Sequence, residues 1–283
     1  MSAESPSLQI VGAMLSHQGC VRTNNEDSVC YVMPRKGDAA ADRGVLAIVA
    51  DGMGGEAAGE VASQIAIDTL QTLYYEMDGS VPDALAASLA AANDAVYRHS
   101  RSDKACAGMG TTCTAIVVRD GELFLGHVGD SRAYMMRGGA LHQISVDHSL
   151  VAALVRDGTL TAEQAAASPD RNVILQALGT RETVDPFLFK EGLPLQPGDV
   201  IVLCSDGLSD LVADPRIAEI VAGIPPLDAC QTLIDAALAA GGHDNVSVGV
   251  FAVTDQLPDA AAAERPTREI NVTREIFLRD DAT

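Results

Sequence analysis

The spacing of apolar residues predicts a series of short buried strands. Four short apolar runs bounded by turn-forming residues are typical of strands, and they lie at 45–50, 113–118, 123–128 and 199–204. Asp120-Gly121 joins the second run to the third, and an Asp-Gly pair is typical of a two-residue hairpin turn. A similar turn is expected at Gly138-Gly139. The strands joined in this way are expected to be antiparallel.

Three longer stretches show the period of a helix instead. The residues that share a predicted apolar face are Ala58, Ala62, Ile65, Thr69 and Leu73 in the first stretch, and Leu85, Leu89, Ala92 and Val96 in the second. Ser80 and Pro82 supply a start signal for the second helix, and the third is expected over about 227–239. Each has a single apolar stripe, which suits a helix lying on a sheet. Antiparallel strands with helices outside them predict an α+β sandwich of two sheets.

One domain is expected over residues 8–253, because the pattern is continuous there and no repeat of fixed period interrupts it. Within it, about 145–180 changes to short helical pieces and loops, which predicts an inserted flap. Residues 254–283 combine an alanine-rich run with alternating charges, and we expect a C-terminal tail that is at least partly mobile.

The chain is strongly acidic. Its 39 acidic and 19 basic residues give a formal charge of −20 at neutral pH. Such a surface repels phosphate backbones and anionic lipids, so neither nucleic acid nor a membrane is expected as a partner. Part of the excess could be a carboxylate cluster that binds cations, and part could simply serve solubility.

Cysteine usage and the N-terminus predict a cytoplasmic protein. The six cysteines are scattered without a CxxC pair, and several, such as Cys204, lie in apolar runs as buried free thiols do. We therefore expect neither a disulfide framework nor a zinc site, and a reducing compartment fits best. No secretory signal is visible, and no apolar run approaches the roughly 18 residues of a membrane span.

Acidic residues recur where predicted strands end or begin. Asp51, Asp130 and Asp206 each lie within two residues after a predicted apolar strand, with glycine beside them. Two more groups precede strands: Glu26 with Asp27, and Asp244. Carboxylates that converge at one end of the sheets would repel one another unless they were protonated or bound cations.

Hard oxygen ligands select Mg²⁺ or Mn²⁺, whereas zinc prefers histidine and cysteine. An Asp-Gly pair by itself is an ordinary turn, so any single one of these positions can be purely structural. The recurrence at five strand ends favours a metal site over five unrelated turns.

These motifs, in this order, resemble a known family. They are Arg22-x-x-Asn-Glu-Asp27, Asp51-Gly-Met-Gly-Gly-Glu-x-Ala-Gly59, Gly110-Thr-Thr112, Gly129-Asp-Ser-Arg132, Asp147-His-Ser149, Gly179, Ser205-Asp-Gly-Leu208 with Asp210, and Asp244-Asn245. The set closely resembles the PP2C-like (PPM) protein serine/threonine phosphatases of the compact bacterial type, over about residues 8–253. The resemblance implies a four-layer α-β-β-α sandwich, with two antiparallel sheets flanked by helices and a metal cleft at one end.

The resemblance also implies the roles of single residues. Asp51 would bridge two Mn²⁺ or Mg²⁺ ions, with the Gly52 carbonyl on one of them. Asp206 and Asp244 would be ligands of one metal, and Glu26 and Asp27 would hold water around the pair. Asp130 and Asp210, with Asp206, would be ligands of a possible third, weaker metal. Arg22 would bind the substrate phosphate.

The implied reaction is direct hydrolysis of phosphoserine or phosphothreonine in other proteins. A water that bridges two metals about 4 Å apart would attack phosphorus in line, without a phosphoenzyme. The implied partners are phosphorylated proteins, among them a Ser/Thr kinase and its substrates. Many eukaryotic members have histidine directly after the first Asp-Gly, whereas this chain has Met53. His127 and His148 are candidate replacements as proton donor, although a histidine inside an apolar strand, such as His127, is typical of a core residue.

Three other functions have less support in the sequence. A catalytically inactive binding module would need the loss of a ligand, but every expected carboxylate is present. Hydrolysis of small phosphoesters or nucleotides is a second alternative, but the sequence does not contain the Gly-x-x-x-x-Gly-Lys-Ser/Thr loop that commonly binds nucleotides. A structural calcium protein would need an Asp-x-Asp-x-Asp-Gly loop, which the sequence does not contain.

Overall fold

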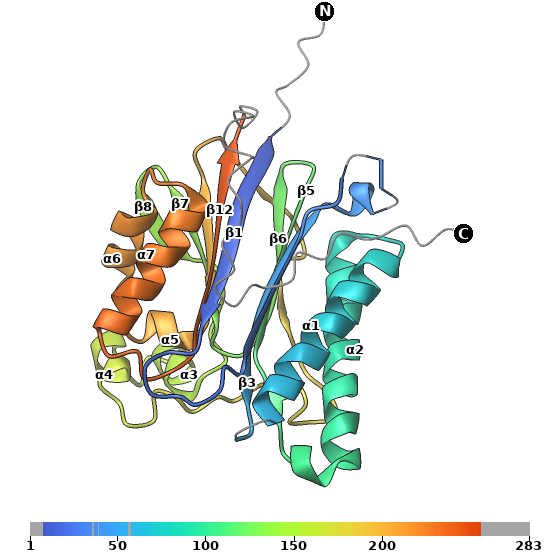
Figure 1. The fold of residues 1–283 in the computed structure, drawn as a ribbon, viewed down its shortest axis with the longest axis vertical. Helices are drawn as coiled ribbons and strands as arrows, with labels where there is room; N and C mark the ends of the chain where they lie inside the picture. The colour runs from blue at the N-terminus through green and yellow to red at the C-terminus, as the bar shows by residue number, and fades with distance from the viewer. Residues whose placement is uncertain (1–7, 36, 39, 56–57, 256–283) are drawn as a thin grey trace, which may run out of the picture.

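Two antiparallel sheets lie face to face at the centre of the molecule (Figure 1). The computed structural model describes residues 8–35, 37–38, 40–55 and 58–255. The first sheet has five strands, in the order β1 (Gln9–His17), β12 (Val246–Thr254), β11 (Val200–Cys204), β7 (Arg132–Arg137) and β8 (Ala140–Gln143). The first and last strands of the described chain, β1 and β12, therefore pair with each other along their whole length.

The second sheet contains the motif-bearing strand β3. Its main order is β10 (Leu193–Pro194), β6 (Glu122–Val128), β5 (Cys113–Arg119), β3 (Val45–Met53) and β2 (Asp27–Val32), with β4 (Gly110–Thr111) paired to β3 and β9 (Phe187–Leu188) to β6. The predicted strands at 45–50, 113–118, 123–128 and 199–204 are all present. Strand β3 continues past its apolar run, so that Asp51 lies within the strand.

Helices cover the outer face of each sheet. Helices α1 (Ala58–Glu76) and α2 (Val81–Ser102) lie on the second sheet, whereas α6 (Asp214–Val221) and α7 (Pro226–Ala239) lie on the first (Figure 1). The predicted α+β fold with two antiparallel sheets flanked by helices is confirmed. No described helix is long and apolar enough to cross a membrane.

Local sequence signals account for several element ends. The Ser80 hydroxyl caps α2 by accepting a hydrogen bond from the Asp83 backbone N–H (3.3 Å). In the β5–β6 hairpin Asp120 and Gly121 have φ values of 53° and 78°, as the predicted tight turn requires. The same left-handed backbone occurs at Gly138 and Gly139, where β7 turns into β8.

The predicted apolar face of α1 is correct at Ala58 and Ala62, which are buried, but not along the rest of the helix. Ile65, Thr69 and Leu73 are only partly buried, and the buried side chains of this helix include Ala66, Leu70 and Tyr74. Helix α1 contacts α2 as well as β2 and β3, so it is buried on more than one side. The predicted stripe therefore covers only part of the buried face. For α2 the predicted face is correct, because Leu85, Leu89, Ala92 and Val96 are all fully buried.

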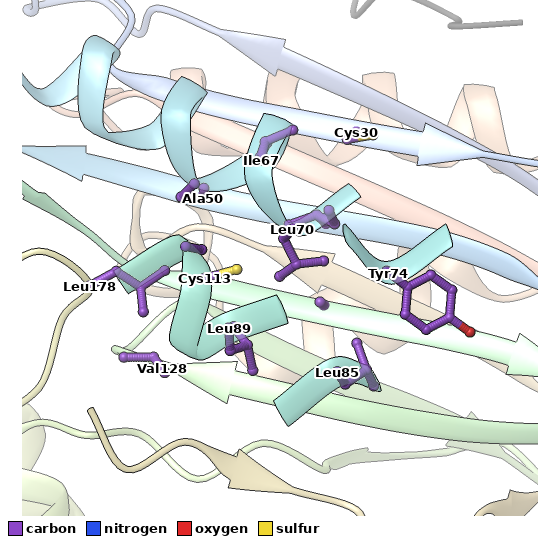
Figure 2. Close-up of a cluster of buried hydrophobic side chains, with 14 of the residues drawn as sticks. Cys30, Ala50, Ile67, Leu70, Tyr74, Leu85, Leu89, Cys113, Val128 and Leu178 are labelled. Carbon is purple, nitrogen blue, oxygen red and sulfur yellow. The ribbon is translucent and has the colours of Figure 1, made fainter. Parts of the chain in front are cut away.

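Three apolar clusters correspond to the three interfaces between the four layers. One lies between α1, α2 and the second sheet, and Figure 2 shows part of it, with Leu70, Leu85 and Leu89 between the helices and the strands. A second joins α6 and α7 to the first sheet. The third lies between the two sheets and includes Phe251 and Leu203. The sheets are therefore held rigidly on both faces.

Truncation of Leu89 is expected to destabilise the fold strongly. Leu89 lies on α2, and its side chain is fully buried in the cluster between the helices and the second sheet. Leu→Ala changes at such sites remove about 2–5 kcal/mol from the free energy of unfolding. Leu227, which is 45% exposed in α7, is the matched control, and Leu227→Ala should cost at most about 0.5 kcal/mol. Urea unfolding of both variants measures the difference; equal midpoints would contradict the assigned core.

The segment predicted as a flap contains two short helices, α3 (Leu150–Arg156) and α4 (Ala162–Ala166). Their start signals are the hydroxyls of Ser149 and Thr161, which accept hydrogen bonds from backbone N–H groups one turn later. The predicted C-terminal tail lies almost entirely outside the described residues, which end at position 255.

Candidate active site

Two of the predicted acidic residues face each other across neighbouring strands. Asp27 begins β2 and is the direct pairing partner of Asp51 in β3. The Asp51 backbone is fixed on its other side, where its N–H donates to the Thr112 hydroxyl (2.9 Å) and its carbonyl accepts from the Thr111 hydroxyl (2.9 Å). Asp51 is thus held by three strands rather than by a loop.

Gly52 lies where two other segments approach the strand. A β-carbon at this position would overlap the backbone carbonyls of Gly59 and Glu26. The Gly52 N–H donates to the Glu26 carbonyl (3.2 Å). Only glycine fits this close approach, which places the start of α1 against the strand that carries Asp51.

The third acidic position lies at the end of the first sheet. Strand β11 ends at Cys204, and Ser205 then precedes the short helix α5 (Asp206–Ser209), whose first residue is Asp206. The Ser205 hydroxyl donates to Oδ2 of Asp27 (2.8 Å) and accepts from the Ser247 N–H (3.0 Å). This serine therefore connects the acidic ends of the two sheets.

Asp244 and Glu26 are positioned by the loop before β12. Oδ2 of Asp244 accepts a hydrogen bond from Nη2 of Arg22 at 2.8 Å. The neighbouring Asn245 accepts from the Glu26 N–H (2.8 Å) and donates to the carbonyls of Gln18 and Asn24 (2.9 and 2.8 Å). One buried asparagine thus joins the Arg22 loop to the Asp244 loop. The Arg22 side chain itself is half exposed, so its guanidinium can still reach a ligand.

The remaining two predicted acids line a cavity of about 660 Å³ beside Asp206. Asp130 follows β6 and Asp210 lies at the end of α5. The same cavity is also lined by residues of α3 and α4 and by Arg171. Nε of Arg171 lies 3.8 Å from Oδ2 of Asp210, an ion pair that joins the predicted flap to the acidic cluster.

The electrostatics of the cluster indicate that it is incomplete without cations. Burial, reinforced by the charges of Asp27, Asp206 and Asp130, raises the pKa of Asp51 well above its usual range. Burial likewise raises the pKa of Asp27 and of Asp130 to about 7, and that of Asp206 to about 6. Several carboxylates therefore lie close together at a high electrostatic cost, which bound cations would remove.

Unpaired oxygen atoms test whether cations fit this site. Among the described residues, four buried carboxylate oxygens accept no hydrogen bond: Oε1 of Glu26 and the Oδ1 atoms of Asp27, Asp130 and Asp206. Buried polar atoms are rarely left in this state unless a ligand or water satisfies them. The donor set consists of carboxylates alone, which is the set that Mg²⁺ and Mn²⁺ prefer. The residues present therefore fit divalent cations.

Neither histidine near the centre is suited to donate a proton. His127 is fully buried in β6, its Nδ1 lies 2.9 Å from the Thr114 hydroxyl, and burial lowers its pKa to about 3. Its ring lies against that of His148, whose pKa burial also lowers. Burial therefore favours the neutral form of both rings, and His127 is the core residue that its apolar strand suggests.

The structure thus brings together all nine predicted site residues: Arg22, Glu26, Asp27, Asp51, Gly52, Asp130, Asp206, Asp210 and Asp244. Ser205, Ser247 and Asn245, which hold the acidic residues in place, and Arg171 have no role predicted from the sequence. Ser205 and Asn245 are each next to a predicted ligand in the sequence, and this position is the signal that could have found them. No such signal marks Arg171, because only the fold brings the predicted flap close to Asp210.

Comparison with known proteins identifies the family. The protein phosphatase 2C family profile matches residues 24–239. The serine/threonine protein phosphatase PstP of Mycobacterium tuberculosis is 41% identical over 244 residues, which cover 86% of this chain and 45% of PstP. This chain therefore spans about half the length of that relative. The protein phosphatase PhpP of Streptococcus pneumoniae is 34% identical over 86% of this chain and 98% of its own length.

A solved structure shows the same fold. The catalytic domain of PstP in complex with two manganese ions superposes with a TM-score of 0.75 at 40% identity, covering 87% of this chain and 99% of that domain. The profile match and both relatives therefore point to one family, and the solved structure agrees with the fold described above. The chain belongs to the protein phosphatase 2C family.

Proposed function

We propose that this chain is a metal-dependent protein phosphatase that hydrolyses phosphoserine and phosphothreonine. The observation that carries the proposal is the buried cluster around Asp51, in which carboxylates from both sheets converge and several oxygens lack a partner. The relatives named as serine/threonine phosphatases, and the two manganese ions in one of them, support it.

In this proposal Asp51, Gly52, Asp206 and Asp244 hold two Mn²⁺ or Mg²⁺ ions, and Glu26 and Asp27 hold water around them. Asp130 and Asp210 complete a possible third site with Asp206. The cations, when bound, supply positive charge to the phosphoryl oxygens and lower the pKa of water. Buried strand ends hold these ligands before the substrate arrives, so little reorganisation is needed.

Arg22 is the proposed phosphate-binding residue. Its planar guanidinium can donate two parallel hydrogen bonds to phosphoryl oxygens. The hydrogen bond to Asp244 orients it at the edge of the cluster while half of its side chain stays in solvent. Arg22 therefore binds and orients the phosphoryl group and balances the charge that develops on it.

The proposed substrates are phosphorylated proteins, among them a Ser/Thr kinase and its targets. The cavity beside Asp206 gives the predicted flap a function in substrate access, because apolar residues of α3 and α4 line it next to the acidic cluster. We also propose a cytoplasmic location, since all six cysteines are free and five of them are buried.

Loss of Arg171 is expected to weaken the binding of protein substrates selectively. Arg171 lies at the cavity beside Asp210, and Arg171→Ala should raise KM for a phosphothreonine peptide roughly fivefold, about 1 kcal/mol of contact energy. The value of kcat/KM for p-nitrophenyl phosphate should change less than twofold. Arg101→Ala, at an exposed position on α2, is the matched control. Equal effects on both substrates would contradict a role of the flap in substrate access.

The proposed function is tested by phosphothreonine-peptide and p-nitrophenyl phosphate hydrolysis with Mn²⁺, with Mg²⁺ and with excess EDTA. We expect turnover with metal and none with EDTA. A folded protein that is inactive with every metal would instead favour a binding module, and activity that persists in EDTA would contradict the metal mechanism.

A further inference from the structure

A second group of potential metal ligands lies at the C-terminal end of α2, outside the acidic cluster. It consists of His99 and Asp103 with Cys106, which is in the single turn η2 (Lys104–Cys106). One ligand atom from each side chain, an imidazole nitrogen, a carboxylate oxygen and the thiol sulfur, lies within 4.8 Å of the other two. Helix α2 ends at the same end of the molecule as β3 (Figure 1).

The backbone explains why the three side chains converge. Asp103 ends α2, with its N–H donating to the His99 carbonyl (3.0 Å), and at the same time begins η2. Its Oδ1 accepts from the Ala105 N–H (2.9 Å), and its carbonyl accepts from the Cys106 N–H (3.1 Å). This tight turn keeps Cys106 on the face of His99 and Asp103, although the helix has ended.

The burial of the three groups is graded. Asp103 is exposed, His99 is half-buried and Cys106 is 7% exposed. Solvent can therefore reach the group from the Asp103 side, while the sulfur lies at the edge of the apolar cluster under α1 and α2. A cation could enter from solvent and meet the thiol at the closed end.

We propose that His99, Asp103 and Cys106 bind one zinc-type divalent cation. Imidazole and thiolate ligands select Zn²⁺ and Co²⁺ over Mg²⁺ and Mn²⁺, which distinguishes this site from the acidic cluster. Three protein ligands leave a fourth tetrahedral position for water. Binding requires the Cys106 thiolate, so the thiol proton is released to solvent as the metal–sulfur bond forms. No CxxC pair marks the site, which is why the sequence alone predicts none.

The site adjoins the segment that supports Asp51. The Cys106 carbonyl accepts from the N–H of Met109, which is fully buried and whose Cα would lie 2.9 Å from a β-carbon at Gly54. The next residues form β4, which pairs with β3, and Thr111 there donates to the Asp51 carbonyl. A cation at Cys106 therefore restrains one end of a short segment whose other end fixes the Asp51 backbone.

Cobalt titration of the reduced, metal-free full chain tests the proposal, with excess Mg²⁺ present to occupy the acidic cluster. Cobalt bonded to a thiolate gives a charge-transfer absorption in the near ultraviolet that oxygen ligands do not give, so the readout is independent of phosphatase activity. We expect one Co²⁺ per chain to saturate this band and Zn²⁺ to abolish it. Absence of a saturable band in the wild type would overturn the proposal.

Variants locate the sulfur and the other ligands. Cys106→Ser should abolish the band, and His99→Gln should weaken Co²⁺ binding at least about tenfold, since one of three protein ligands is lost. His99→Gln also keeps the test valid if Cys106→Ser does not fold. Cys20→Ser, which removes the exposed cysteine, should leave the band unchanged. A band that survives Cys106→Ser in a folded protein, disappears in Cys20→Ser or is unaffected by His99→Gln would contradict the assignment.

Discussion

Asp206→Asn is expected to lower kcat for a phosphothreonine peptide by about 1000-fold or more. Asparagine keeps the size of the side chain at the start of α5 but removes a charge that we assign to the metal ligands. Loss of metal-assisted stabilisation of the reaction is worth several kcal/mol, and about 4 kcal/mol corresponds to a factor of 1000 in rate. The measurement is steady-state hydrolysis of the peptide with saturating Mn²⁺.

The same variant should remain folded. Burial and the charges of Asp244 and Asp210 raise the pKa of Asp206, so its removal relieves repulsion in the metal-free chain. We therefore expect the metal-free Tm to stay equal or to rise. Asp235→Asn, at an exposed position on α7, is the matched control and should retain full activity. An Asp206→Asn protein with wild-type turnover would remove Asp206 from the proposed ligands.

The second large effect is a loss of stability of the metal-free chain as pH rises. Asp206 has a folded pKa of about 6, and Asp27 and Asp130 have about 7, whereas an unfolded aspartate titrates near 3.9. A raised carboxyl pKa means that the folded state binds more protons than the unfolded state between these values. The contribution of these groups to the free energy of unfolding is therefore greatest below about pH 4, and it is lost as the pH rises to about 7.

Thermal unfolding in EDTA at pH 5 and at pH 8 measures this effect. Together the three groups should account for a few kcal/mol, or on the order of 10 °C in Tm. Mn²⁺ at pH 8 should restore the lost stability, because it binds the folded state only. Asp130→Asn should reduce the difference between the two pH values, whereas Asp235→Asn should not. A metal-free Tm that rises from pH 5 to pH 8 would contradict the assigned repulsion.

Much of the fold could be predicted because local signals and tertiary context agree. The Asp120-Gly121 turn and the apolar runs on either side of it specify a hairpin without reference to the rest of the chain. The face of α1 could be predicted only in part, at Ala58 and Ala62, since Leu70 and Tyr74 are buried by additional contacts with α2 and two strands. Periodicity finds a helix reliably, but a wide buried face leaves its orientation undetermined.

The convergence of the acidic residues could be predicted because these residues follow or precede strands in motifs whose order resembles a known family. The connecting groups could not. Ser205 joins Asp27 to β12 through side-chain hydrogen bonds, and Asn245 joins two loops separated by more than 200 positions. Such contacts depend on the three-dimensional pairing of β1, β12 and β11, which no local pattern encodes. The same holds for Arg171 beside Asp210 and for Cys106 beside His99.

The central claim is that the buried carboxylates around Asp51 bind the divalent cations. Calorimetric titration of the metal-free chain with Mn²⁺, repeated with Asp51→Asn, tests it most directly, because Asp51 is the proposed ligand common to both ions. We expect the wild type to bind at least two Mn²⁺ per chain and the folded Asp51→Asn protein to lose both high-affinity sites. Mn²⁺ binding that is unchanged in Asp51→Asn, or absent from the wild type, would contradict the account.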